Sequence, residues 1–76
     1  MGFAELKPIV GTCNVVIDSD FRYSELYSLV GKAASMENGT LTVVVKNGTL
    51  CGSEIESLAK LGGRYVTLDF TDAAQR

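Results

Sequence analysis

The residues whose types and spacing favour chemistry cluster in a short loop around Cys51. Cys51 is followed by Gly52 and Ser53, just before a stretch with a helical pattern. A thiol at a helix N-terminus feels the positive end of the helix dipole, which favours a nucleophilic thiolate. The backbone amides of such a loop can also hold a phosphate or carboxylate. The candidate reactive-thiol or anion loop comprises Gly48, Thr49, Cys51, Gly52 and Ser53.

This loop lacks the complete motif of a known phosphate-binding class. No Gly-Lys-Ser/Thr sequence follows it, as a nucleotide-binding P-loop requires. The fifth residue after Cys51 is Ser57 rather than the arginine of a cysteine phosphatase loop. The structural alternative is that Cys51 packs as a small buried residue under the turn, because free cysteine is among the most buried residue types.

Carboxylates form a second group with chemical potential. Asp18, Asp20, Asp69 and Asp72 lie at or just past the carboxyl ends of predicted strands. Ligands of open α/β sheets bind at that edge, and Mg²⁺ prefers such oxygen ligands. The alternative is a row of alternating charge, Asp18, Lys46 and Asp69, across neighbouring strands. We favour the charge row and expect no metal and no cofactor.

Three runs rich in β-branched residues predict the strands that position these groups. They cover residues 13–18, 40–46 and 64–70. In each run the apolar residues alternate with polar or small ones, as in strands with one buried face. The residues predicted to face the core are Cys13, Val15, Ile17, Val43, Val45, Val66, Leu68 and Phe70.

Two helical patterns lie between these strands. Ser24 is the predicted N-cap of the first helix, which Asn38-Gly39 ends. Ser53 to Glu56 fits a capping box that starts the second helix, and Gly62-Gly63 ends it. The predicted buried face of the first helix includes Leu26, Leu29, Val30 and Ala33, and that of the second comprises Ile55, Leu58, Ala59 and Leu61.

The helix starts resemble each other, since residues 24–30 and 53–59 both begin with Ser-Glu beside a β-branched run. This internal strand–helix repeat predicts a small two-layer βαβαβ domain of the α/β class. Its three mostly parallel strands carry two helices on one face. The strands lie in the order 1-2-3 or 2-1-3. The single domain divides into a covering segment (1–12), two strand–helix units (13–39 and 40–63), a closing strand (64–70) and a tail (71–76).

The second face of this sheet is predicted to lie open. It presents Val16, Val44, Tyr65 and Thr67, which form a candidate contact surface. The outer strands also have unpaired edges, which are templates for self-association unless they are blocked.

Composition narrows the function classes. The chain has 76 residues, a net charge of −2, no histidine and no run of basic residues. These features argue against nucleic-acid binding and against an anionic membrane surface. No apolar stretch approaches the roughly 20 residues of a membrane span. The two cysteines are too few for a disulfide framework, so we expect a cytoplasmic protein with reduced thiols.

The sequence therefore favours a non-enzymatic interaction module that binds itself or another protein, with no catalytic residues. Its short length and one-sided sheet motivate this hypothesis. One alternative is a small-ligand or phosphate-binding domain that uses the 48–53 loop, with Cys51 as a reactive thiol. Another is a piece of a longer repeat array, because strand–helix units of this length are typical of such arrays.

Overall fold

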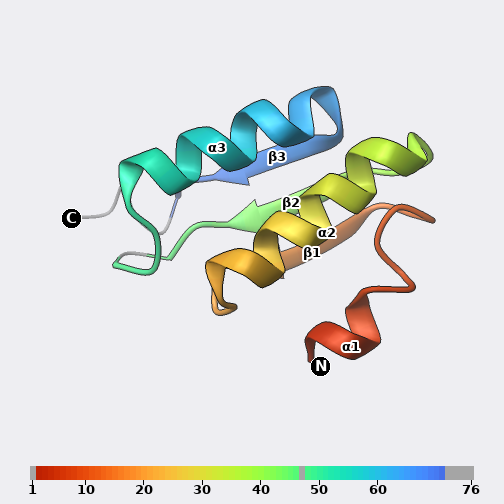
Figure 1. The fold of residues 1–76 in the computed structure, drawn as a ribbon, viewed down its shortest axis with the longest axis horizontal. Coiled ribbons are helices and arrows are strands. Elements are labelled where there is room, and N and C mark those ends of the chain that lie inside the picture. Colours follow the sequence, from red (N-terminus) through yellow and green to blue (C-terminus); the bar gives the residue numbers. More distant parts are fainter. Residues whose placement is uncertain (1, 47, 72–76) are drawn as a thin grey trace.

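Helices and strands alternate along the chain (Figure 1). The computed structural model describes residues 2–46 and 48–71. The elements are α1 (Phe3–Leu6), β1 (Val15–Asp18), α2 (Tyr23–Met36), β2 (Leu41–Val44), α3 (Gly52–Gly62), the 3-10 helix η1 (Gly63–Tyr65) and β3 (Val66–Asp69). Within these described ranges the strands form one parallel sheet in the order β1-β2-β3. This arrangement confirms the order 1-2-3 and excludes 2-1-3.

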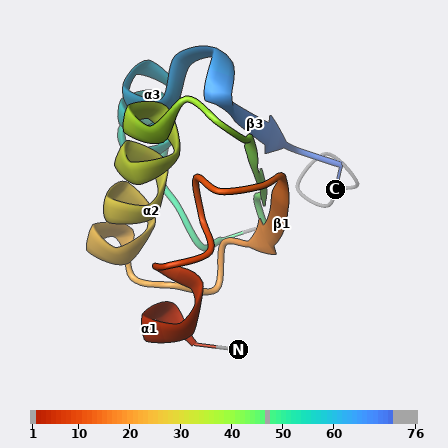
Figure 2. The ribbon, with the colours of Figure 1, turned by 90° about the vertical axis from the view of Figure 1, so that its right-hand side faces the viewer.

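Helices α2 and α3 lie side by side on one face of the sheet (Figure 2). The small two-layer βαβαβ fold is therefore confirmed. Its cause is the alternation of the strands, which offers only one apolar face for helices to cover. The internal repeat itself stays a sequence-based prediction.

The core lies between the two layers and is centred on β2 and α2. Leu41 and Val43 of β2 are fully buried because a strand flanks β2 on each side and the helices cover it. The remaining fully buried apolar residues come from the helices and the N-terminal segment: Val10, Leu26, Leu29, Val30, Ala33 and Leu58. Burying side chains of this size contributes about 1.5–3 kcal/mol each to folding.

The N-terminal segment lies on the β1 side of the molecule (Figure 2). Leu6 of α1 and Val10 are both buried in the core. Pro8 follows α1, consistent with its inability to continue a helix. The segment therefore closes the β1 end of the space between sheet and helices.

Both helices begin earlier than the sequence pattern predicted. Ser24 and Ser53 lie inside the first turn and are not N-caps. Glu25 and Glu54 instead each accept a hydrogen bond, of 3.1 Å, from the backbone N–H three residues earlier. The predicted Ser53-to-Glu56 capping box is wrong because Glu54, one residue after the serine, is the carboxylate that reaches back.

The helix ends agree with the prediction only for α3. Gly63 is the C-cap of α3 and has a φ of 55°, a conformation that glycine adopts without strain. Helix α2 ends at Met36, and its C-cap is Glu37, in the left-handed region with a φ of 54°, rather than Asn38-Gly39. A Cβ at Gly39 would lie 2.4 Å from the carbonyl oxygen of Cys13, so this glycine allows two backbone segments to approach closely.

Two predictions about the strands are wrong. Cys13 is exposed and lies outside β1, which starts at Val15, so it contributes nothing to the core. The alternating charge row does not form, because Asp18 and Asp69 both flank Val44 in the register. Lys46 lies past the end of β2 and pairs with Asp20 at 3.1 Å.

Candidate functional site

The loops that follow β1 and β2 meet at the carboxyl edge of the sheet through a buried serine. Ser19 is 1% exposed, and its Oγ accepts the backbone N–H of Lys46 at 2.8 Å. The Oγ1 of Thr49 lies 2.6 Å from Ser19 Oγ and donates to the Lys46 carbonyl at 2.6 Å. Since Thr49 has one hydroxyl proton, Ser19 is the donor between the two hydroxyls. These bonds satisfy the buried hydroxyl of Ser19 and the backbone N–H of Lys46, and they fix the start of the 48–53 loop.

The candidate Cys51 loop is open to solvent rather than packed. Gly48, Thr49, Gly52 and Ser53 are exposed, and Gly48 has a φ of 83°. Cys51 is also exposed and is the N-cap of α3, so the alternative of a buried thiol under the turn is wrong. Its Sγ lies 3.3 Å from the hydroxyl of Ser53.

The electrostatics of this loop oppose an anionic ligand. The carboxylate of Glu54 accepts the backbone N–H of Cys51 at 3.1 Å, in the position where an anion would bind a helix N-terminus. Asp18, Asp20 and Asp69 end or follow strands at the same edge, and Lys46 is already paired with Asp20. A phosphate bound here would therefore have to displace the Glu54 carboxylate, and the neighbouring aspartates would repel it.

The carboxylates of Asp18 and Asp69 accept hydrogen bonds from backbone N–H groups in the loops that follow them. Asp18 accepts the N–H of Asp20 at 3.0 Å, and Asp69 accepts the N–H of Thr71 at 2.9 Å. Hydrogen bonds from Thr71 lower the pKa of Asp69 below its ordinary value of 3.8; the bond from the Thr71 side chain has the larger effect, and the bond from its backbone amide adds to it. Within residues 2–46 and 48–71, no cluster of three acidic or cysteine side chains suits a metal ion. Asp72 lies outside the described residues.

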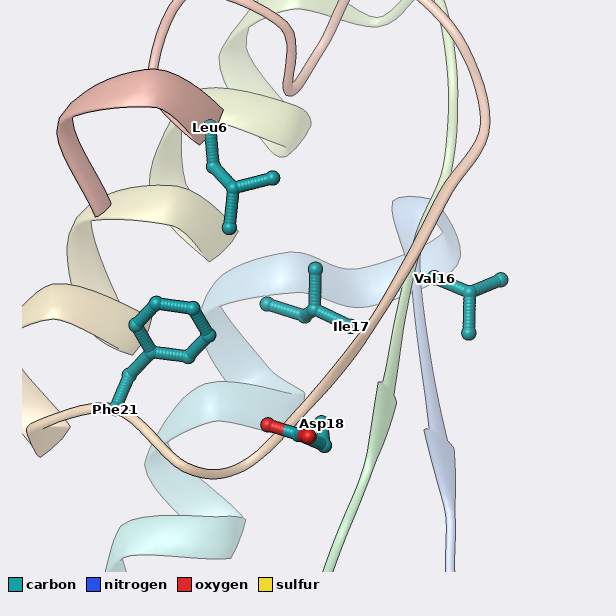
Figure 3. A pocket seen from close by; sticks show the side chains of 5 residues that line it. All are labelled: Leu6, Val16, Ile17, Asp18 and Phe21. Atoms are coloured by element: carbon teal, nitrogen blue, oxygen red, sulfur yellow. The ribbon is translucent and has the colours of Figure 1, made fainter. Parts of the chain in front are cut away.

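A shallow pocket of about 240 Å³ lies along β1 (Figure 3). Its lining residues are Leu6, Val16, Ile17, Asp18 and Phe21. Leu6, Ile17 and Phe21 point toward one another, whereas Val16 points to the opposite side of the strand (Figure 3). The carboxylate of Asp18 is the one charged group in this lining, so the pocket offers little to orient a polar ligand.

The open face of the sheet is mixed in character. Val16 is 70% exposed and Thr67 is exposed, while Val44 is half-buried. Tyr65 lies in η1, ahead of β3, so the predicted contact set is not one strand surface. Val44 has the carboxylates Asp18 and Asp69 as its register neighbours, which makes this face a poor apolar patch.

The β3 side of the molecule carries apolar residues that stay partly exposed within the described part of the chain. Val66 and Leu68 of β3 and Ile55 of α3 are only half-buried. Phe70, predicted to face the core, is 42% exposed. Ala59, predicted to be buried, is exposed. We call these five residues the β3-side surface.

The position of Ala59 follows from helix geometry. Leu58 is fully buried, and Leu61 packs toward α2, because a Cβ at Gly31 of α2 would lie 3.6 Å from its Cδ2. Successive helix residues are about 100° apart, so Ala59 lies about 160° from Leu61. Ala59 therefore points away from α2, beyond β3.

The sequence pattern marked these residues as apolar but placed them in the core. The missed signal is the order of elements: β3 is the last described element, and no described helix follows to cover its outer side. Within the described ranges, no helix is long and apolar enough to cross a membrane. Comparison of the chain with models of known families, with curated proteins and with solved structures finds no match in any of the three.

Proposed function

We propose that this protein is a non-enzymatic interaction module that binds another protein chain along its β3-side surface. The observation that carries the proposal is the difference between the two ends of the core. Leu6 and Val10 close the β1 end, whereas Leu68 and Phe70 leave the β3 end partly exposed to solvent. Contiguous exposed apolar surface on a small protein is typical of an interaction site.

The β3 edge also offers backbone hydrogen bonds to a partner. The carbonyl of Asp69 accepts the N–H of Val45 at 2.8 Å, so it points toward β2. Backbone groups of successive strand residues point to opposite sides, and those of Leu68 therefore point outward. An extended chain can add to such an edge, where main-chain bonds supply affinity and side-chain contacts supply specificity.

The same proposal places the protein in the cytoplasm. Cys13 and Cys51 are both free and both exposed. Exposed free thiols suit a reducing compartment, where disulfides rarely form. This assignment is tested by fractionating cells that produce the protein, and recovery outside the cytoplasm would contradict it.

Selection from a library of random displayed peptides tests the binding proposal. We expect it to enrich extended peptides rich in β-branched and aromatic residues, with the backbone amide of Leu68 shifting in NMR titrations. Ala59→Lys places a charge on the β3-side surface and should weaken binding at least tenfold, about 1.4 kcal/mol. Ser28→Lys, at an exposed position of α2, is the matched control and should bind normally.

Two results would contradict the proposal. One is a failure to enrich any peptide while the protein is also monomeric at millimolar concentration. The other is peptide binding that Ala59→Lys leaves unchanged and that shifts amides away from β3.

A further inference from the structure

We propose that Asn38 is a site of spontaneous modification, where the side-chain amide converts to a carboxylate through a cyclic imide with the backbone nitrogen of Gly39. These two residues lie in the turn between α2 and β2, beside the start of β1 (Figure 1). Asparagine is one of the thermolabile residue types. This inference is independent of the β3-side surface and of the proposed function.

The reaction needs only water as a reactant. The nitrogen of Gly39 gives up its proton and attacks the side-chain carbonyl carbon of Asn38. An N–C bond forms, the bond from that carbon to the amide nitrogen breaks, and the amide nitrogen takes up a proton and leaves as ammonia. Water then opens the imide at either of its two carbonyls. One opening gives aspartate in an unchanged backbone. The other gives isoaspartate, whose main chain runs through the side-chain carboxyl carbon and is one methylene longer.

Both groups that take part in the attack are free to react. The Asn38 side chain is exposed, and its hydrogen bond from Nδ2 to the carbonyl of Thr12 is weak because it is 3.4 Å long. Gly39 lies outside the helices and strands, and its N–H donates no hydrogen bond to the residues that the structure describes. Such an N–H exchanges its proton with solvent more readily than one held in a helix or a strand ladder.

Packing keeps a glycine after Asn38. A Cβ at Gly39 would lie 2.4 Å from the carbonyl oxygen of Cys13 and 2.9 Å from its Cα, so a larger residue does not fit without a shift of the backbone. Glycine also has no side chain to shield its nitrogen. The close contact that shapes this turn therefore also preserves the reactive pair.

Asn14 lies at the same end of the sheet but in a protected setting. Its Oδ1 accepts the N–H of Thr40 at 2.9 Å. The following residue, Val15, is β-branched, and its N–H donates to the carbonyl of Thr40 at 2.8 Å. The nitrogen that would attack the Asn14 side chain is therefore both bonded and crowded. The structure thus predicts slow modification at Asn14 and faster modification at Asn38.

The modification weakens the hold of this turn on the segment before β1. A carboxylate at Asn38 cannot donate to the carbonyl of Thr12 and repels its oxygen. It also lies just past the C-terminus of α2, beside Glu37, where the helix dipole disfavours negative charge and the last turn has no basic residue. Isoaspartate adds a methylene next to the close contact at Gly39. We therefore expect residues 2–14 to pack less firmly in the modified protein.

Peptide mapping of stored protein tests the site. The protein is kept warm at mildly alkaline pH, and trypsin then places Asn14, Asn38 and Asn47 on the separate fragments 1–22, 33–46 and 47–60. We expect fragment 33–46 to change from amide to acid at least about tenfold faster than fragment 1–22, since the Asn14 site must first break a hydrogen bond. Isoaspartate-specific methylation should label fragment 33–46. Asn38→Gln, which keeps an amide but must form a larger ring, is the matched control and should prevent that label.

A comparison with the unfolded chain decides the outcome. If Asn38 stays unchanged in the folded protein while it converts in urea, the fold protects the turn and the proposal is overturned. An equal rate at Asn14 and Asn38 in the folded protein would also overturn it.

The stability of the products tests the consequence for the fold. Asn38→Asp supplies the charge in an unchanged backbone and is the matched control for isoaspartate. We expect the isoaspartyl protein, separated by ion exchange, to unfold at a lower urea concentration than Asn38→Asp, with shifted amide signals of Leu6 and Val10. Equal unfolding midpoints for the fresh, isoaspartyl and Asn38→Asp proteins would overturn the proposed loosening of the N-terminal segment.

Discussion

Ser19 shows how one hydroxyl can join two loops. Its Oγ bonds to the Lys46 amide and to Thr49, 30 positions along the chain, within the carboxyl edge of the sheet. Nothing in the sequence singles out Ser19, because a serine after a strand looks like any turn residue. Its role depends on parallel pairing of β1 with β2, which brings the two loops together. The exposed Cys51, by contrast, attracts attention in the sequence but makes few contacts.

Ser19→Ala should therefore destabilise the fold by about 1–3 kcal/mol, because it leaves the partly buried Lys46 amide without its acceptor. Ser28→Ala, at an exposed helical position, is the matched control and should change stability by less than about 0.5 kcal/mol. Urea unfolding followed by circular dichroism measures both values. An equal effect of the two substitutions would show that the Ser19 bonds contribute nothing to stability.

At the scale of elements, local patterns predicted the type of each main helix and strand but not its boundaries. Alternation and helical periodicity identified β1, α2, β2, α3 and β3 because burial of one face decides both patterns. The N-caps were misassigned because Ser and Glu are adjacent at both helix starts. Only the observed bonds show that Glu25 and Glu54 act as the capping carboxylates.

Two glycines of α3 are expected to respond oppositely to an added methyl group. At Gly62 a Cβ would lie 2.2 Å from Val66 and 3.0 Å from Val30, so Gly62→Ala should cost about 1–3 kcal/mol. At Gly52 a Cβ meets nothing within 4 Å, so Gly52→Ala should stabilise the protein by about 0.4–1 kcal/mol. Thermal unfolding of both variants measures the difference. A stabilised Gly62→Ala variant would contradict the close packing of α3 on β3.

At the scale of the molecule, the one-sided alternation of the strands predicted the two layers. The exposure of the β3 side within the described residues could not be predicted from the sequence. Periodicity shows that Ala59 and Phe70 belong to apolar faces, but not whether another element packs against those faces. The N-terminal segment, whose sequence pattern is weak, is what distinguishes the two ends of the core. Its Leu6 and Val10 are buried through contacts with distant parts of the chain.

The parallel order β1-β2-β3 also determines how the protein bears a mechanical load. Because the strands are parallel, the chain enters β1 at the amino end of the sheet and leaves β3 at the carboxyl end. A force applied between residues 14 and 70 therefore acts along the strands, and the ladder bonds must break together. Handles at residues 20 and 70, both at the carboxyl edge, instead open the bonds one after another. Single-molecule stretching should record a higher unfolding force for the first pair of handles, and equal forces would contradict this loading geometry.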